Sequence, residues 1–164
     1  MNFEIRKITE QDIEQFRQAV GKVAREKLYL AFLDSPSTEM AKDFILNNIR
    51  ESWPHVVAVS SNKIIGWCDI VGSNRHACVH LGTLGIGIEK EYRGSGIGRQ
   101  LINNALELAE VRGLTRIELA VREDNNRAIH LYKTLGFKVE GMHIKSLLID
   151  GKYYNQISMA LLLN

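Results

Sequence analysis

One stretch near the middle of the chain decides the fold: Ile86-Gly87-Ile88-Glu89-Lys90-Glu91-Tyr92-Arg93-Gly94-Ser95-Gly96-Ile97-Gly98-Arg99. It predicts the end of a buried strand, a tight glycine turn and the first turn of a helix. The turn glycines lack Cβ atoms, so the backbone can adopt positive φ or approach a ligand closely. The helix begins with unpaired N–H groups and a partial positive charge, to which Arg93 adds a full charge. The stretch therefore predicts a phosphate site.

The glycine spacing separates several known phosphate loops. No G-x-x-x-x-G-K-[ST] run is present, and a G-x-G-x-x-G reading that starts at Gly94 ends on Arg99 instead of the packing glycine. The pattern [QR]-x-x-G-x-[GA] is met by Arg93, Gly96 and Gly98. This loop resembles the acetyl-CoA loop of the GNAT superfamily of N-acetyltransferases.

A second motif supports the same resemblance. Residues 125–137 read Asn-Asn-Arg-Ala-Ile-His-Leu-Tyr-Lys-Thr-Leu-Gly-Phe, which is similar to the N-x-x-A-x-x-L-Y-x-x-x-G-F of that superfamily. Both motifs occur in the family's order and separation. The resemblance implies an acyltransferase that uses acetyl-CoA as co-substrate.

Bulk composition sets the limits of the interpretation. The 164 residues predict a single domain over 1–164, and 45% hydrophobic with 24% charged residues is typical of an ordinary globular chain. The net charge of +2 favours neither a nucleic-acid nor a membrane partner. The sequence shows no signal peptide and no apolar run of membrane-spanning length, and it has only two cysteines. We therefore expect a cytoplasmic protein.

Periodicity predicts alternating strands and helices along the chain. Strands are expected at 3–8, 56–59, 64–71, 79–88, 116–121, 137–149 and 153–162, and helices from about 12, from 38 to about 53, after the glycine turn to Gly113, and at 125–135. This order is similar to the GNAT arrangement, an α/β (α+β) fold with a mixed, mostly antiparallel sheet of six to seven strands flanked by four helices. Residues 1–77 match it by pattern alone.

Gly82, Gly85 and Gly87 fall inside the expected strand 79–88. Glycine in a strand often marks a bulge or a close backbone approach, although strong twist is an equally simple explanation. The resemblance implies a bulged strand that separates from its neighbour and admits the pantetheine arm of the cofactor.

The resemblance also implies the cofactor site. Backbone amides of residues 94–99 would bind the pyrophosphate, and the strand before them would bind the pantetheine and the thioester oxygen. Asn125 also fits a simple helix N-cap. The implied cofactor-binding residues are Ile86, Gly87, Ile88, Arg93, Gly94, Ser95, Gly96, Ile97, Gly98, Arg99, Asn125, Ala128 and Tyr132.

Two residues are candidates for proton transfer. Tyr132 stands where the family places its general acid, although its spacing also fits a core aromatic residue. Histone acetyltransferases of the superfamily carry a glutamate thirteen residues before the Gln/Arg position of the loop, and the corresponding residue is His80. A histidine suits a base at neutral pH, although a half-exposed strand histidine is an equal alternative. Glu118 and Asp69 are the reserve bases.

The acceptor site is expected between the first two helices, the long strand and the last hairpin. Glu26, Tyr29, Trp67 and Tyr153 are the candidate substrate-binding residues, with Glu26 holding a cationic amine or simply facing solvent. His76, Cys78 and His80 alternate on an expected strand, but three ligands so close on one strand seldom converge. No metal is therefore expected.

The acceptor favoured by the sequence is a primary amine of a small molecule or amino acid, attacked directly in a ternary complex, since no Cys–His nucleophile pair is evident. Ribosomal-protein N-terminal acetylases carry a glutamate where Ala120 precedes Val121, which disfavours but leaves open a protein N-terminus. A non-catalytic acetyl-CoA sensor is the other alternative. An exposed last strand leaves a homodimer open.

Overall fold

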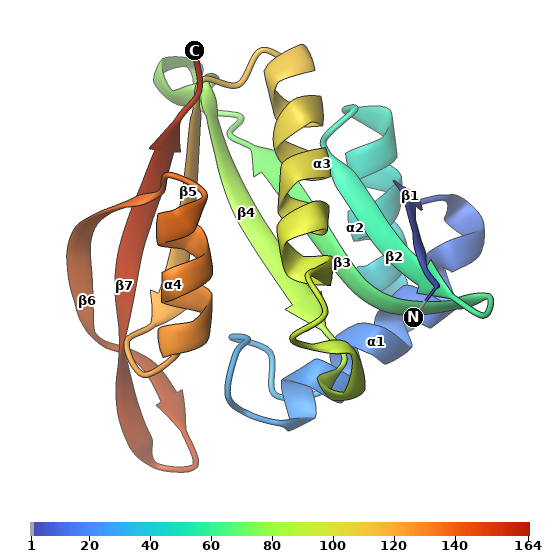
Figure 1. Ribbon diagram of the computed structural model, residues 1–164, viewed down its shortest axis with the longest axis horizontal. Coiled ribbons are helices and arrows are strands. Elements are labelled where there is room, and N and C mark those ends of the chain that lie inside the picture. Colours follow the sequence, from blue (N-terminus) through green and yellow to red (C-terminus); the bar gives the residue numbers. More distant parts are fainter. Residues whose placement is uncertain (1) are drawn as a thin grey trace.

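A seven-stranded mixed sheet forms the centre of the computed structural model, which describes residues 2–164. Its strands are β1 (Glu4–Lys7), β2 (His55–Ser60), β3 (Lys63–Gly72), β4 (Leu81–Ile88), β5 (Arg116–Arg122), β6 (Lys138–Ile149) and β7 (Lys152–Leu162). They lie in the order β1-β2-β3-β4-β5-β7-β6 (Figure 1). Among the paired strands of the described residues only β4 and β5 are parallel. The expected mixed, mostly antiparallel sheet is confirmed.

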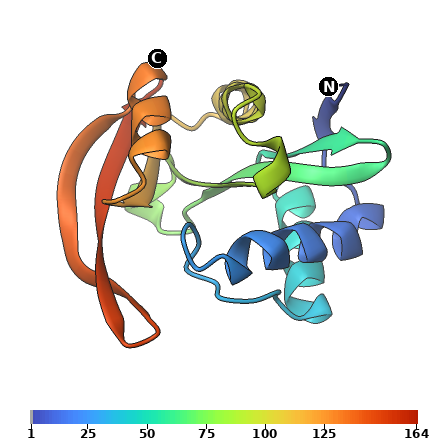
Figure 2. The same cartoon turned by 60° about the horizontal axis from the view of Figure 1, so that its bottom comes forward.

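Four helices cover the two faces of this sheet. They are α1 (Ile13–Arg25), α2 (Thr38–Arg50), α3 (Ile97–Val111) and α4 (Asn126–Thr134). Figure 2 shows α1 and α2 on one face, and α3 and α4 on the other. Each pair covers its own apolar cluster, because the side chains of a strand alternate between the two faces. We call these the α1/α2 face and the α3/α4 face.

Side-chain caps fix the starts of two helices that position the site. The Ser37 hydroxyl accepts a hydrogen bond from the Met40 amide at 3.1 Å and begins α2. The Asn125 side chain accepts one from the Ala128 amide at 3.2 Å and begins α4. Both caps use a side-chain oxygen to satisfy an orphan amide of the first turn.

The sheet opens between β4 and β5. Their parallel pairing is limited to residues 81–83 of β4 and 116–118 of β5, so the strands separate after Thr83. From there to Ile88, β4 keeps β3 as its only strand neighbour within the described residues. The opening implied by the resemblance is present, but the bulge is not, because the register of β4 with β3 runs without interruption from Gly82 to Ile88.

Two expectations about strand limits were wrong. The strand expected from residue 79 begins at Leu81, and residues 76–78 form a 3-10 turn, so His76, Cys78 and His80 do not share a strand face. The last strand, β7, lies inside the sheet, and β6 is the exposed edge on that side. Any pairing with a second copy through this part of the sheet would therefore involve β6. No helix in residues 2–164 is long and apolar enough to cross a bilayer.

Candidate active site

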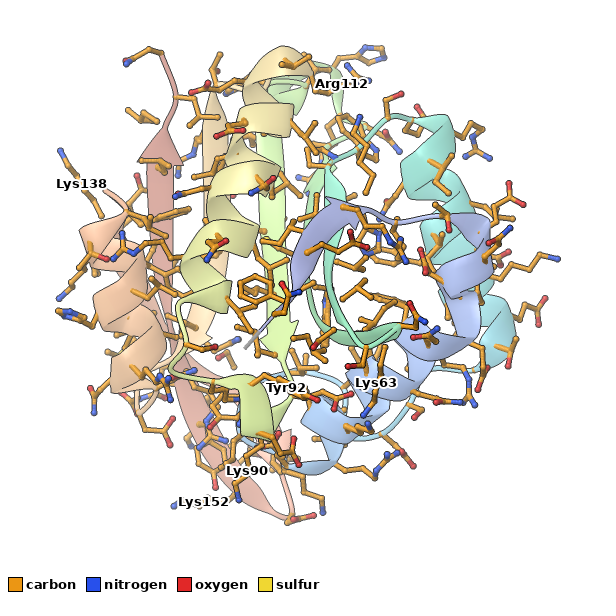
Figure 3. The ribbon with its side chains drawn as sticks, turned by 45° about the vertical axis from the view of Figure 1, so that its right-hand side comes forward. Lys63, Lys90, Tyr92, Arg112, Lys138 and Lys152 are labelled. Carbon is orange, nitrogen blue, oxygen red and sulfur yellow. The ribbon has the colours of Figure 1, made fainter. Side chains whose placement is uncertain are left out.

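The glycine turn after β4 leaves open space around the N-terminus of α3, and we call this space the phosphate seat. Gly94 and Gly96 have φ of 86° and 83°, which side chains with a Cβ rarely adopt. A Cβ placed on Gly96 would meet no heavy atom within 4 Å, so the space above the first turn of α3 is free. Figure 3 shows Tyr92 at this end of α3 and Arg112 at the other end. Free amides of a helix start in an open space can bind an anion.

The Arg93 side chain points away from this seat. Its Nε donates to the Ile88 carbonyl at 2.8 Å, and its guanidinium forms a two-pronged pair with the Glu26 carboxylate at 2.8 and 2.6 Å. The Tyr29 ring stacks 4.5 Å from the same guanidinium. Glu26 is thus not a free carboxylate, and only the backbone of Arg93 remains for a phosphate.

Another arginine, which the sequence analysis missed, lies across the phosphate loop. Arg127 comes from the first turn of α4, and its Nη2 lies 2.9 Å from the place where a Cβ of Gly94 would stand. Arg99, on α3, donates to the Thr134 hydroxyl at 2.7 Å and is exposed. Arg127 occupies a variable position of the Asn125–Phe137 motif, so the pattern alone gave no reason to choose it.

Tyr132 lies on the α3/α4 face of the opening. Its side chain is 7% exposed, and its ring centre is 5.8 Å from that of Phe137. Burial, with a smaller effect of the nearby Cys68 thiol, raises the pKa of the phenol, which keeps it protonated at neutral pH. Cys68 pairs with Ile86 of β4, so Tyr132 lies beside the part of β4 that no longer contacts β5. The hydroxyl has no hydrogen-bond partner within residues 2–164.

Glycines on β4 make room for two β3 side chains on the α1/α2 face. A Cβ on Gly87 would lie 2.2 Å from the Trp67 ring, and one on Gly85 would lie 3.2 Å from both carboxylate oxygens of Asp69. Trp67, an expected acceptor-site residue, is buried and packs edge-on against Phe16 with ring centres 5.7 Å apart. This crowding from β3 is a physical reason for glycine at these positions of β4.

Asp69 is a buried carboxyl with no protein partner. Asp69 is 8% exposed, and its carboxylate accepts no hydrogen bond from any group within residues 2–164. Loss of solvation raises the pKa of Asp69 to about 7. Of the two reserve bases, Asp69 is thus the one with a buried and unpartnered carboxyl.

The other candidate bases lie elsewhere or are already paired. His80 is exposed in the turn before β4, where its carbonyl accepts the Thr115 and Arg116 amides. It is six residues before Ile86, or roughly 20 Å along an extended chain. Glu118 accepts a hydrogen bond from Arg116 Nε at 2.7 Å. The placement of His80 expected from the motif count was wrong because the chain is a turn, not strand, at that position.

The loop after α1 and the last hairpin are tied together beside the opening. Lys27 Nζ is 2.8 Å from the Asp150 carboxylate, and the Lys27 carbonyl accepts from Arg122 at 2.9 Å. Arg122 is buried and stacks 3.8 Å from the Tyr154 ring. The expected acceptor residue Tyr153 is instead largely exposed, with Lys145 over its ring.

A cavity of about 300 Å³ lies between this loop and the start of α4. Its lining residues are Leu28, Tyr29, Arg122, Asp124, Asn125, Asn126 and Arg127. The cavity thus joins the expected acceptor residue Tyr29 to the expected cofactor residue Asn125. Within residues 2–164 no group of three or more His, Cys, Asp or Glu side chains is placed to hold a metal ion.

Comparisons with known proteins agree with this geometry. The model of the acetyltransferase (GNAT) family matches residues 18–137. The L-amino acid N-acetyltransferase AaaT of Escherichia coli is 29% identical over 95% of both chains. The spermidine N(1)-acetyltransferase of the same species is 36% identical over 45% of this chain and 40% of its own length.

Solved structures show the same fold. An acetyltransferase of the GNAT family from Streptococcus pneumoniae has a TM-score of 0.92, 27% identity, and coverage of 99% of this chain and 100% of that chain. A putative acetyltransferase from Salmonella typhimurium, solved with its cofactor acetyl-CoA, has a TM-score of 0.92 over 99% of this chain and 94% of that chain, at 15% identity. Since the family model covers well over half of the sequence, the chain belongs to the GNAT family of acetyltransferases.

Proposed function

We propose that this protein transfers the acetyl group of acetyl-CoA to a primary amine of a small molecule or amino acid, by direct attack in a ternary complex. The observation that carries the proposal is the unpartnered Tyr132 phenol beside the opening of β4 and β5, on the same face of the sheet as α3 and its glycine turn. A sensor that only binds acetyl-CoA would need the seat and the opening, but not a phenol held protonated beside them.

The chain's own groups fit each part of the co-substrate. The free amides at the start of α3 suit the pyrophosphate, and the Arg127 side chain adds positive charge across the loop. The edge of β4 that has no strand neighbour suits the amides of the pantetheine and the thioester oxygen, through the backbone of Ile86 and the amide of Ile88, since the Ile88 carbonyl already accepts a hydrogen bond from Arg93. Asn125 already caps α4 and keeps its amide group available for a further contact with the pantetheine.

In the transfer step the amine nitrogen forms a bond to the thioester carbon, and the carbon–sulfur bond breaks. The departing thiolate takes the phenolic proton of Tyr132 and leaves as CoA thiol. The nitrogen loses one proton as the amide forms, and this proton balances the one that Tyr132 delivered. No covalent acetyl-enzyme is needed.

The ties beside the opening favour a small acceptor over a protein N-terminus. The Lys27–Asp150 ion pair and the Arg122 hydrogen bond to Lys27 link the loop after α1 to the last hairpin. A polyamine or an amino acid needs less space beside this link than an extended peptide does. Relatives named for spermidine and for L-amino acids support the same class of acceptor.

The test is release of CoA thiol from acetyl-CoA with spermidine, single L-amino acids and a peptide bearing a free ribosomal N-terminus. We expect turnover with one of the two small-molecule classes and none with the peptide. Turnover with the peptide alone would replace the proposed acceptor. Tight binding of CoA by calorimetry without turnover on any acceptor would favour the sensor.

A further inference from the structure

We propose that Asp69 is the catalytic base of this enzyme and that the acceptor enters as a primary alkylammonium ion bound by its carboxylate. This inference rests on the acetyl-transfer function proposed above. It assigns the proton-accepting role to β3, on the face of the sheet opposite to Tyr132, and it defines the acceptor by its charge.

The position of Asp69 follows from the register of four strands. Directly paired residues of neighbouring strands share a face, so His55, Asp69 and Gly85 form one row on the α1/α2 face. The neighbouring row on this face, towards the start of β4, contains Thr83, which is the last residue of β4 to pair with β5. The row that contains Asp69 is therefore the first row on this face to border the part of β4 that has no β5 neighbour.

The carboxylate leans across β4 towards this opening. Both of its oxygens lie 3.2 Å from the place that a Cβ of Gly85 would occupy, so the group extends over the glycine. Any side chain at Gly85 would separate the carboxylate from the opening. Tyr132 borders the same part of β4 from the other face, through Cys68 and Ile86. A thioester in the opening would thus have a phenol on one side and a carboxyl on the other.

The charged groups around Asp69 leave it as the free carboxylate of the site. His55, its neighbour on β2, is buried, and burial lowers its pKa to about 3, so it is neutral. Glu118 on β5 pairs with Thr83 just before the opening begins, and its carboxylate accepts a hydrogen bond from Arg116. At the end of α1, Glu26 is paired with Arg93, and Asp12, at the start of that helix, is paired with Arg6.

A free, poorly solvated carboxylate attracts a cation of small size. An alkylammonium ion supplies the missing charge and hydrogen bonds, since the protein supplies neither. Burial raises the pKa of Asp69 to about 7, so the carboxylate is available at neutral pH and is a stronger base than an ordinary aspartate. An acceptor with a neutral, weakly basic amine gains nothing from such a site.

The proton step is balanced within the site. The ammonium nitrogen gives one proton to the Asp69 carboxylate, which becomes a neutral carboxyl, and the freed lone pair then attacks the thioester carbon. The carbon–sulfur bond breaks, and Tyr132 protonates the thiolate as described above. The second proton lost by nitrogen restores the tyrosine, and Asp69 returns its proton to solvent after the product leaves.

The experiment compares the wild type, Asp69→Asn and the control Glu118→Gln, using spermidine or the L-amino acid that the wild type acetylates best. For the wild type we expect kcat/KM to rise tenfold per pH unit below about 7 and to level off above it. Asp69→Asn should lower kcat about 10²-fold and move this rise to the pKa of the amine itself. Glu118→Gln should keep the wild-type profile, and calorimetry should show unchanged CoA binding in both variants.

Either of two results would overturn the assignment: full kcat in Asp69→Asn, or a rise near pH 7 that persists in it. In both cases turnover by the wild type would leave the proposed function standing. Absence of turnover in the wild type with every acceptor would instead remove the proposed function, and the base with it.

Discussion

The two faces of the sheet at the β3–β4 pair differ in what they hold beside the same opening. On the α3/α4 face, Cys68 and Ile86 are apolar neighbours of a buried phenol, Tyr132. On the α1/α2 face, Asp69 and Trp67 lean over Gly85 and Gly87. The α3/α4 face is thus a packed apolar core that contains the Tyr132 phenol as a proton donor. The α1/α2 face has the Asp69 carboxylate lying over a glycine of β4.

This difference separates the two halves of the reaction in space. In the proposed mechanism, burial in an apolar cluster keeps Tyr132 protonated on the donor side, while Asp69 on the acceptor side has no protein partner. Cys68, which lies near Tyr132, and Asp69 are consecutive residues of β3, so the two groups lie on opposite faces of the sheet near the place where β5 has moved away. The predictions below test whether the two faces act separately.

The largest effect is expected at the phosphate seat. In Gly96→Trp the indole would fill the free space above α3, and binding of CoA should fall below detection by calorimetry. Gly113→Trp is a matched control, because Gly113 follows the other end of α3 with φ of 87° and has equally free space. Both variants carry the same backbone strain, so a loss of CoA binding in both would mean that strain, not the seat, is responsible.

The next largest effect is expected at Tyr132, the proposed acid on the α3/α4 face. Tyr132→Phe removes one hydroxyl from a buried ring, and kcat should fall about 10²-fold or more because the thiolate loses its proton donor. Binding of acetyl-CoA and the thermal midpoint should change little, since the ring still packs against Phe137. Rapid-quench measurement of a single turnover checks this, and an unchanged chemical step would exclude Tyr132 as the acid.

The elements that carry the proposed donor site were predictable from the sequence because their signals are local. A glycine turn and a helix start fix the seat within residues 94–99, and the second motif places Tyr132 on the following helix. The order of strands and helices along the chain also follows from periodicity, and the structure confirms it. Contacts between distant segments were not predicted, and the pairing of Glu26 with Arg93, 67 positions later, is an example.

The acceptor side was less predictable for the same reason. Asp69 is an ordinary alternating position of a strand, and only its register with Gly85 shows that its carboxylate lies over β4 beside the opening. Counting back from the loop to His80 assumed continuous strand, but the chain turns before Leu81. Glycines at two alternate positions of β4 were the one signal available in the sequence, since they imply that a neighbouring side chain needs the space.

The buried carboxyl of Asp69 should also lower the free energy of unfolding, unlike the apolar residues of the other face. Its pKa of about 7 lies above the ordinary value of 3.8, so the folded state holds the proton more tightly than the unfolded state. The wild type should therefore lose stability as pH rises from about 4 to about 7. Asp69→Asn should be more stable by about 2 to 4 kcal/mol at pH 8 and nearly equal to wild type at pH 4.

Urea unfolding of both proteins from pH 4 to pH 8 measures this difference. An increase in stability together with a loss of kcat is typical of a functional residue in an unfavourable environment. If the variant were instead less stable than the wild type at pH 8, the Asp69 carboxylate would have a stabilising partner in the folded protein. The statement that it is unpaired would then be wrong.

A smaller effect is expected where the two sides are joined. Glu26→Gln breaks the two-pronged pair with Arg93 and should lower the free energy of unfolding by about 1 to 2 kcal/mol, since both side chains are mostly buried. The loop that carries Tyr29 would lose its anchor, so KM for the amine should rise several-fold while kcat changes little. Steady-state kinetics with saturating acetyl-CoA checks this, and a rise confined to the KM for acetyl-CoA would place the pair on the donor side instead.

The smallest effect is expected at His80, which the loop motif alone would name as the base. His80→Ala should leave kcat and its pH profile unchanged, because the side chain is exposed in the turn before β4 and lies roughly 20 Å along the strand from Ile86. Its structural contribution is its carbonyl, which accepts the Thr115 and Arg116 amides and which alanine retains. Steady-state kinetics between pH 5 and pH 9 makes the measurement. If kcat fell and the rise near pH 7 were lost, His80, just before the start of β4, would be the base, and the assignment of acid and base to opposite faces of the sheet would be wrong. An unchanged profile would support Asp69 on β3 as the base.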